Sequence, residues 1–272
     1  MHAHDDHEDD FGGLHKDLIL VGSAMKRRDV LRVMLGASVG ASVIQLLGCG
    51  SGSSVSDPNS TGGDQCTAKI PEETAGPYPG DGSNGPDVLT ETGVVRRDIR
   101  SSVAGLSGTA EGIPLTVTLT IVSASSCEPL AGHAVYLWHC DRTGPYSLYL
   151  SGVTDQNYLR GVQEADADGK VTFTTIFPAC YSHRWPHIHF EVYPSLAAAT
   201  SASSRVATSQ LALPKATCDL VYATVGYEQS ITNLQQVSLA TDMVFSDSAS
   251  LEIPSVSGDV NSGFTATLNV AV

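Results

Sequence analysis

The chain has 272 residues, of which 42% are hydrophobic, 16% are charged and 6% are aromatic, enough apolar material for one sizeable globular core. Lys and Arg number 15 against 29 Asp and Glu, which gives a formal net charge of −14, and the acidic residues are scattered along the chain. No basic stripe is available to displace the counterions of a phosphate backbone, so the composition argues against a nucleic-acid partner.

The amino-terminal region has the pattern of an export signal. Arg27 and Arg28 precede an apolar run over residues 33–47, and this arrangement resembles a twin-arginine signal. The run ends in Leu-Leu-Gly-Cys, which resembles the lipobox of a bacterial lipoprotein with Cys49 as the lipidated residue. A transmembrane anchor is the alternative, but the run is shorter than the ~20 residues that span a bilayer. We therefore predict a signal region over residues 1–48 and a membrane attachment through a lipid on Cys49. The expected location is the cell surface, the periplasmic face or the secreted fraction.

An acidic, histidine-rich stretch precedes this signal, although a signal of this kind normally starts the chain. We therefore expect translation to begin at Met25. The alternative is a metal-binding tract formed by His2, His4, His7 and His15, which lack the regular spacing of metal ligands.

A linker follows the lipobox. Residues 50–63 are rich in Gly and Ser and cannot bury enough apolar surface to order themselves, so we predict a flexible lipid-anchored linker over residues 49–65. The folded domain then covers residues 66–272. It contains five cysteines: Cys66, Cys127, Cys140, Cys180 and Cys218. Outside the cytoplasm cysteines can pair, but an odd number leaves at least one thiol free or paired between chains, and the pairing pattern stays open here.

The domain itself is dominated by short alternating runs. Thr, Val, Ile and Phe recur with a period of two, which a half-buried strand selects. The expected strands are residues 115–122, 134–140, 170–176, 187–192, 236–239 and 264–272. Turn signals separate them, and long stretches of 3.6-residue periodicity are missing. We therefore predict an all-β fold, a β-sandwich with long active-site loops, and at most a short helix near residues 215–224.

The segment Pro-His-Ile-His-Phe-Glu-Val at residues 186–192 carries the first chemical signal. Strand alternation places His187 and His189 on one face, while the apolar residues between and after them point to the other. A His-x-His pair alone is a weak signal. Two upstream loops each add a tyrosine, however: Tyr181 lies six residues before His187, and Tyr146 follows a Gly-Pro turn. Two phenols and two imidazoles can therefore converge on one metal ion.

Four segments together resemble the intradiol ring-cleavage dioxygenases, such as protocatechuate 3,4-dioxygenase and catechol 1,2-dioxygenase. They are Pro-Glu-Glu-Thr-Ala-Gly-Pro-Tyr at 71–78, the Trp-to-Tyr segment at 138–146, Pro-Ala-Cys-Tyr at 178–181 and Arg-Trp-Pro-His-Ile-His-Phe at 184–190. The resemblance covers roughly residues 71–214. It implies that residues 66–272 form an intradiol dioxygenase β-sandwich.

The resemblance also implies a cofactor and a reaction. One Fe(III) per chain is expected, with the ligands Tyr146, Tyr181, His187 and His189. Phenolate ligands are hard and anionic and favour ferric over ferrous iron, and a position left open would accept a bidentate catecholate. The expected reaction cleaves a catechol-type ring between its hydroxylated carbons with O2, giving a muconate-type diacid.

Further residues receive roles from the same resemblance. Tyr181 is expected to leave the metal as substrate binds and to take a substrate proton, and Arg184 to bind substrate and stabilise charge on its ring. Gln210 is expected to accompany Arg184, and Tyr78 to line the substrate mouth. Pro145 stands where the best-studied members carry Arg, which predicts a preference for neutral catechols over protocatechuate. No helical dimerisation domain precedes the sandwich, so the oligomeric state stays open.

Two other readings of the His-x-His pair remain. Cupins and copper/zinc sandwiches use such pairs, but the cupin pattern places a Glu several residues beyond the second His, and neither class explains two tyrosines in turns. A surface-attached β-sandwich binding module without activity is the non-enzymatic alternative, and the joint presence of four ligands and Arg184 argues against it.

Overall fold

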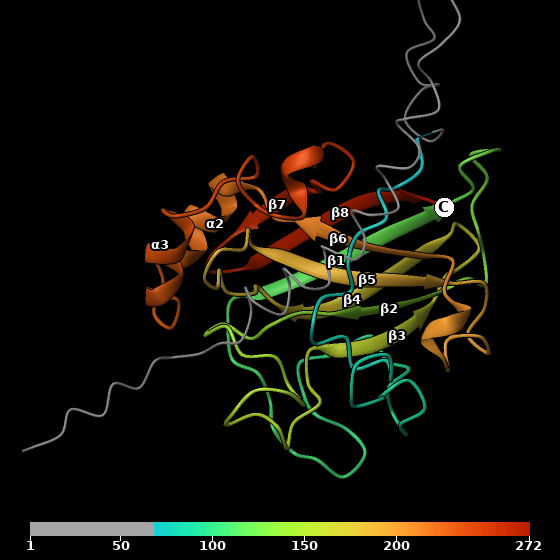
Figure 1. The fold of residues 1–272 in the computed structure, drawn as a ribbon, viewed down its shortest axis with the longest axis horizontal. Helices are drawn as coiled ribbons and strands as arrows, with labels where there is room; N and C mark the ends of the chain where they lie inside the picture. Colours follow the sequence, from blue (N-terminus) through green and yellow to red (C-terminus); the bar gives the residue numbers. More distant parts are fainter. Residues whose placement is uncertain (1–67) are drawn as a thin grey trace, which may run out of the picture.

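The structure is a computed structural model that describes residues 68–272, and the predicted export signal, Cys49 and the whole predicted linker lie outside them. Within the described residues, eight strands form two four-stranded sheets (Figure 1). The first sheet has the order β4-β1-β8-β7 and the second the order β3-β2-β5-β6. All neighbouring strands are antiparallel except β1 and β8. The strands are β1 Pro114–Val122, β2 Ala134–Trp138, β3 Arg160–Glu164, β4 Lys170–Ile176, β5 His187–Tyr193, β6 Ala207–Ala212, β7 Ser255–Asp259 and β8 Gly263–Ala271.

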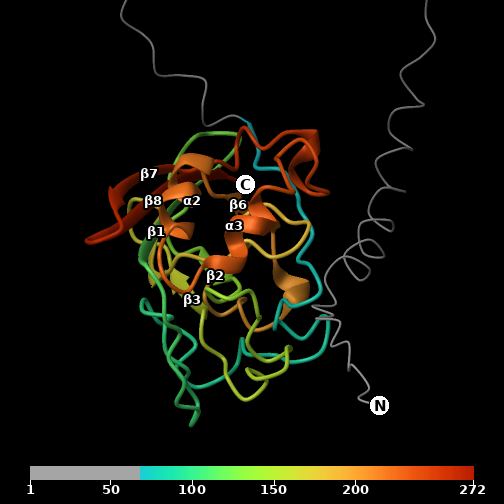
Figure 2. The ribbon, with the colours of Figure 1, turned by 90° about the vertical axis from the view of Figure 1, so that its left-hand side faces the viewer.

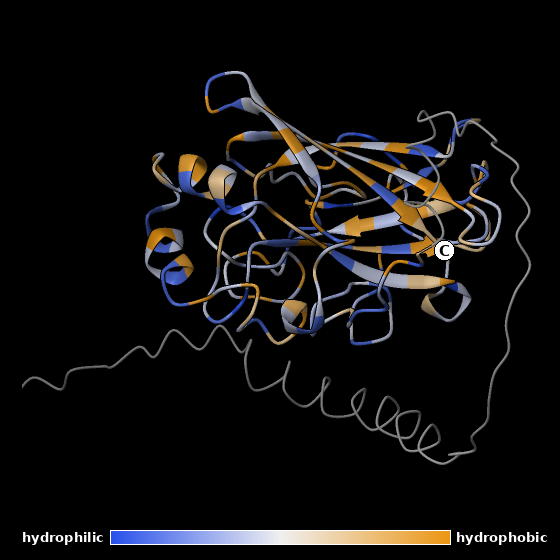
Figure 3. Ribbon diagram, turned by 90° about the horizontal axis from the view of Figure 1, so that it is seen from above, coloured by the Kyte–Doolittle hydropathy of each residue, from blue (hydrophilic) through white to orange (hydrophobic). Residues whose placement is uncertain are grey.

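The core lies between the two sheets. On β1 buried apolar residues alternate with partly exposed threonines, as a strand with one solvent-facing side requires. One hydrophobic cluster joins the buried side of this strand to the second sheet, and the strands carry much of the apolar colour in Figure 3. Its members include Leu115, Val117, Leu119 and Ile121 from β1, Phe173 from β4, and Ile188, Phe190 and Val192 from β5.

The second sheet is covered on its other face by loops. All residues of β2 and β5 are buried, so neither strand meets solvent on either side. A second cluster packs Tyr136 and Trp138 of β2 against Tyr78, Leu89 and Tyr146 from the covering loops. Polar side chains on this face of β5 are therefore enclosed, which is the condition for a dry metal centre.

Two α-helices lie together at one end of the sandwich, as Figures 1 and 2 show. They are α2 Lys215–Tyr222 and α3 Glu228–Leu234; single 3-10 turns, η2 and η3, occupy Ala202–Ser204 and Phe245–Asp247. Among residues 68–272, none of the helices has the length and apolar character that crossing a membrane requires.

The all-β prediction is confirmed, including the short helix near residue 215, but the strand predicted over residues 236–239 is wrong. That segment is a turn held by local hydrogen bonds: Thr241 N donates to Ser238 O at 3.0 Å and Asp242 N to the same oxygen at 2.9 Å. Strands β3, β6 and β7 and helix α3 were not predicted. β6 is buried at all six positions and β7 is mostly exposed, so neither shows the alternation on which the prediction relied.

The cysteines divide into two classes. Cys127 forms a disulfide, and its partner lies outside the described residues. Cys140, Cys180 and Cys218 are free and buried. Burial raises the pKa of each of these three thiols, so they are protonated and unreactive near neutral pH.

A buried carboxyl group lies beside β6. Glu252 is 0% exposed; its backbone carbonyl accepts a hydrogen bond from Ala212 N at 2.9 Å, and its Oε1 accepts one from Ser209 Oγ at 3.3 Å. Burial, and then the neighbouring Glu73 carboxylate, raise the pKa of Glu252 from its ordinary value near 4.5 to about 8. The protonated carboxyl group of Glu252 therefore stabilises the folded state relative to the unfolded state. This stabilisation is present below the pKa of Glu252 in the unfolded chain and is lost as pH rises through its pKa in the folded protein.

We predict that Glu252→Gln removes this pH dependence. Between pH 5 and pH 8 the free energy of unfolding of the wild type should fall relative to that of the variant by on the order of a few kcal/mol. Urea denaturation at both pH values measures it. Glu164→Gln, at an exposed position of β3, is the control and should follow the wild type. A difference between wild type and Glu252→Gln that does not change with pH would contradict the prediction.

Candidate metal centre

Strand pairing in the second sheet aligns four side chains along one side of the site. Trp138 pairs with Arg160 on one side and with His189 on the other, and His189 pairs with Gln210. These four side chains therefore form one row across β3, β2, β5 and β6, on the face that the loops cover. The Trp138 indole stacks on the His189 ring with 4.9 Å between centroids and 6° between planes. This contact holds the imidazole in one orientation.

Four donor atoms meet beside this row. Tyr146 Oη lies 3.4 Å from His187 Nε2 and 3.2 Å from His189 Nε2. Tyr181 Oη lies 3.1 Å from His187 Nε2, and the two Nε2 atoms are 3.1 Å apart. Donor atoms that each bind one ion at ~2 Å are ~3 Å from one another, so the spacing fits a shared metal ion. The structure thus brings together all four residues predicted as ligands.

The imidazoles are prepared for metal binding. His187 Nδ1 is 2.5 Å from the carbonyl oxygen of Trp185, which assigns the ring proton to Nδ1 and leaves the Nε2 lone pair for a metal. Burial lowers the pKa of both His187 and His189 well below the ordinary histidine value, with repulsion from neighbouring cationic groups acting in the same direction. Both rings are therefore neutral, which is the form that coordinates metal.

The tyrosines complete the donor set. Among residues 68–272, no group of three or more His, Cys, Asp and Glu side chains is placed to hold a metal ion, and the further donors beside the two imidazoles are the phenol oxygens of Tyr146 and Tyr181. Burial raises the pKa of Tyr146 well above its ordinary value, and the neighbouring Tyr181 adds to the effect. The Tyr146 phenol therefore ionises only where a cation compensates its charge. Two phenols and two imidazoles suit a hard, highly charged ion such as ferric iron.

A buried guanidinium lies next to this centre. Arg184 is 2% exposed, and its Nη2 donates to Gln210 Oε1 at 2.7 Å. Gln210 Nε2 in turn donates to Thr74 O at 2.8 Å. The predicted pairing of Arg184 with Gln210 is therefore present in the geometry. A third partner was not predicted: Asp242 Oδ2 accepts a hydrogen bond from Arg184 Nε at 3.0 Å.

The loop that carries Tyr181 is held by the helix pair. Ser230 Oγ accepts a hydrogen bond from Cys180 N at 3.0 Å, and Asn233 Nδ2 donates to Cys180 O at 2.8 Å. Tyr222 Oη also donates to Pro178 O at 3.1 Å. Side chains from α2 and α3 thus satisfy the backbone on the amino-terminal side of Tyr181 and fix where this loop lies.

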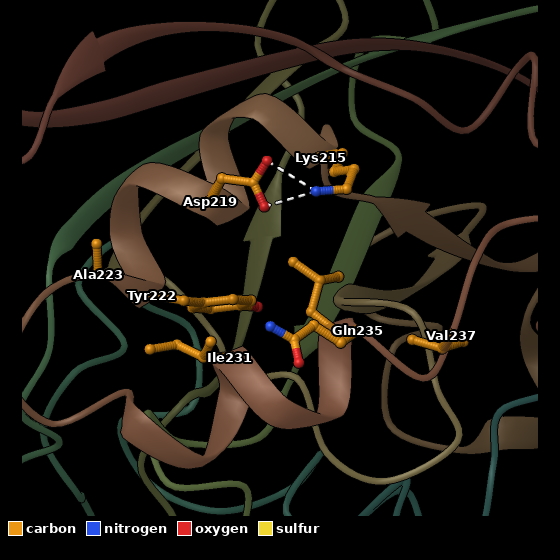
Figure 4. A pocket seen from close by; sticks show the side chains of 8 residues that line it. Lys215, Asp219, Tyr222, Ala223, Ile231, Gln235 and Val237 are labelled. Atoms are coloured by element: carbon orange, nitrogen blue, oxygen red, sulfur yellow. Dashed lines mark hydrogen bonds and ion pairs between the residues drawn. The ribbon is translucent and has the colours of Figure 1, made fainter.

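The same two helices enclose a cleft of about 410 Å3 (Figure 4). Its rim carries an ion pair between Lys215 and Asp219, whose Nζ and Oδ1 atoms are 2.7 Å apart. None of the predicted site residues lines this cleft. It is separate from the four converging donors.

The loop that carries Tyr146 depends on Arg160, which sequence reasoning missed. This buried side chain donates to Pro79 O at 2.8 Å, and to Tyr78 O and Ser147 O at 3.0 Å each. It therefore ties the segment around Tyr78 to the segment around Tyr146. The rings of Tyr78 and Tyr146 lie 5.3 Å apart, so Tyr78 borders the four donors, with Pro145 directly before Tyr146. The role of Tyr78 at a substrate mouth stays a prediction. No local motif marks Arg160, because its contacts join segments far apart in the chain.

The remaining histidines of this region lie outside the donor set. His139 is buried, with Nε2 2.7 Å from Thr175 Oγ1 and Nδ1 2.7 Å from Cys140 O. Burial lowers the pKa of His139 to about 4, so it is a neutral hydrogen-bonding group. His183 is exposed in the turn before Arg184.

Comparison with known proteins identifies the family of this chain. The family model described as Dioxygenase matches residues 84–225, which is more than half of the chain. An intradiol ring-cleavage dioxygenase from Tetranychus urticae shares 25% identity at a TM-score of 0.59, over 75% of this chain and 94% of that one. A second dioxygenase structure shares 26% identity at a TM-score of 0.59, over 75% and 93%. The 3-chlorocatechol 1,2-dioxygenase of Rhodococcus opacus 1CP is a weaker match, at 15% identity and a TM-score of 0.48 over 73% and 70%. The chain belongs to the intradiol ring-cleavage dioxygenase family.

We predict that His187→Ala and His189→Ala each abolish retention of the bound metal, because each change removes one of only four donor atoms. Metal content of the purified proteins, measured by inductively coupled plasma mass spectrometry, tests this. His183→Asn is the matched control, since it changes an exposed histidine in the adjoining turn and should keep the metal. Full metal occupancy in either alanine variant would mean that the metal lies elsewhere.

Proposed function

We propose that this chain is a ferric-iron-dependent intradiol dioxygenase that cleaves a catechol-type ring between its two hydroxylated carbons. The observation that carries the proposal is the convergence of two phenol oxygens and two imidazole nitrogens, with four donor-to-donor distances of 3.1 to 3.4 Å, beside a buried guanidinium. Membership of the intradiol family supports the reaction class. The proposed ligands of one Fe(III) per chain are Tyr146, Tyr181, His187 and His189.

Ferric iron bound here would supply a position at which both oxygens of a catecholate can chelate and an acceptor for electron density from the ring. The protein supplies the surroundings. Burial of β5 on both faces excludes water from the imidazoles. A water-excluded site strengthens every electrostatic contact to the substrate.

The two tyrosines differ in their freedom to move. Tyr146 is 2% exposed and packed in the loop cluster, whereas Tyr181 is only partly buried. Of the two phenols, Tyr181 therefore has more room to leave the centre, and its Oη is the group that takes a proton from the incoming catechol. The positive guanidinium of Arg184 lies beside the four donors, where it stabilises negative charge that develops on the catechol ring.

The residue before Tyr146 bears on the choice of substrate. Pro145 has no charge and no side-chain hydrogen-bond donor. A carboxylate on the ring would meet no cation from this position. We therefore propose neutral catechols as the substrate class.

We predict that purified protein containing one iron per chain shows a broad visible charge-transfer band and converts catechol to cis,cis-muconate with both atoms of O2 incorporated. Neutral catechols should react faster than protocatechuate. Mass spectrometry of products formed under 18O2 measures both the cleavage position and the oxygen count, and iron-free protein is the control. A ring-opened semialdehyde, or no turnover of any catechol by iron-loaded protein, would refute the assignment.

We further propose that the enzyme is exported by a twin-arginine route and anchored by a lipid on Cys49. Such a route suits an enzyme that folds around its metal before it crosses the membrane. We predict that Arg27→Lys/Arg28→Lys protein stays inside the cell, and that Cys49→Ser protein moves from the membrane fraction to the soluble exported fraction. Cell fractionation and immunoblotting measure both. Unchanged export or unchanged membrane association would remove the corresponding half of the proposal.

A further inference from the structure

We propose that Asp242 is the positioning residue that holds Arg184 in its working orientation. The inference rests on the proposed function, because it concerns how the arginine acts on a catechol ring. Asp242 is 0% exposed and Arg184 is 2% exposed, and their Nε and Oδ2 atoms are 3.0 Å apart. The pair is thus a fully buried salt bridge at the edge of the metal centre.

Every acceptor contact of Asp242 serves to fix its carboxylate. Oδ1 accepts hydrogen bonds from Val244 N at 2.8 Å and Phe245 N at 3.1 Å, which anchor the group to its own turn. Oδ2 accepts from Arg184 Nε and from Trp185 N, the latter at 2.7 Å. The carboxylate cannot rotate without losing several of these bonds, so it is a rigid support.

The guanidinium is held at two points of its plane. Asp242 binds Nε, and Gln210 Oε1 accepts from Nη2 at 2.7 Å. Because a guanidinium is planar, two in-plane contacts define the direction of the whole group. Asp242 also supplies the negative charge that a buried cation needs, which Gln210 cannot do.

Asp242 also connects this arginine to a proposed metal ligand. The peptide that follows Arg184 donates to Asp242 through Trp185 N, and the carbonyl of Trp185 holds His187 Nδ1. One carboxylate therefore sets both the arginine and the turn that leads into the His-x-His strand. It comes from a segment after α3, outside residues 84–225 that match the family model.

The test is a double-mutant cycle with Arg184→Ala, Asp242→Asn and the double variant. Asp242→Asn should lower kcat by roughly 100-fold, the effect of a displacement of ~1 Å near the reacting atoms. The iron content, the visible band and KM should change little. In the Arg184→Ala background the same change should lower kcat far less, because only the contact of Asp242 with Trp185 N is then left to lose. Asp247→Asn, an exposed residue of the same segment, is the matched control and should keep wild-type activity.

Thermal unfolding gives a readout that does not depend on activity. Each single variant leaves a buried charge without its partner, whereas the double variant removes both charges. The double variant should therefore have a higher Tm than Arg184→Ala. A double variant with a Tm at or below the Tm of Arg184→Ala would show that the two charges are not coupled.

Guanidinium rescue keeps the test decisive if Asp242→Asn alone does not fold. Millimolar guanidinium should restore part of the lost kcat to Arg184→Ala, where the Asp242 carboxylate can still bind the cation, but not to the double variant. Equal rescue of Arg184→Ala and the double variant, or rescue of neither, overturns the inference. So does an Asp242→Asn change that lowers kcat equally in the wild type and in Arg184→Ala. Wild-type protein without any catechol turnover would instead refute the proposed function.

Discussion

One constraint shapes the structure: one face of β5 packs into the core, and the other carries the histidines of the candidate metal centre. Ile188 and Phe190 join the hydrophobic cluster between the sheets, while His187 and His189 point to the opposite side. Strand alternation places the two histidines on the same face of β5. Because β5 is buried on both faces, the protein must enclose these histidines with loops, and those loops bring the phenols.

The loops are ordered by buried polar groups rather than by regular pairing. Arg160 joins the Tyr78 and Tyr146 segments through main-chain carbonyls, and side chains from α2 and α3 bind the backbone before Tyr181. Asp242 does the same for the turn at Arg184. A buried donor or acceptor that loses its partner costs free energy, so each of these contacts makes one loop conformation much more favourable than the others.

Sequence was sufficient where the signal is local. Alternation identified β1 and β4, and the His-x-His pair with the two upstream tyrosines predicted residues that the structure brings together. The role of Arg184 came from the family resemblance. The sequence was insufficient for β6, which is buried at every position and so lacks alternation, and for residues 236–239, which form a turn. Arg160 and Asp242 were missed for a different reason. Each forms hydrogen bonds with residues far away in the sequence. Asp242 lies 57 residues from Trp185, and Arg160 lies 81 residues from Pro79, so no local pattern encodes these contacts.

Charge balance links the buried groups to the proposed reaction. Burial keeps His187 and His189 neutral by lowering each pKa, and Asp242 offsets the charge of Arg184. Under the proposed function, two phenolates offset two of the three charges of a ferric ion and leave a single positive charge. A doubly ionised catecholate would then make the buried centre negative, which a low dielectric disfavours. If Tyr181 took one of the two catechol protons and left as a neutral phenol, with the second proton released to solvent, the centre would be neutral. Tyr181 is partly exposed and Tyr146 is fully buried, so of the two phenols Tyr181 is the one that fits the proposed role of a ligand that leaves.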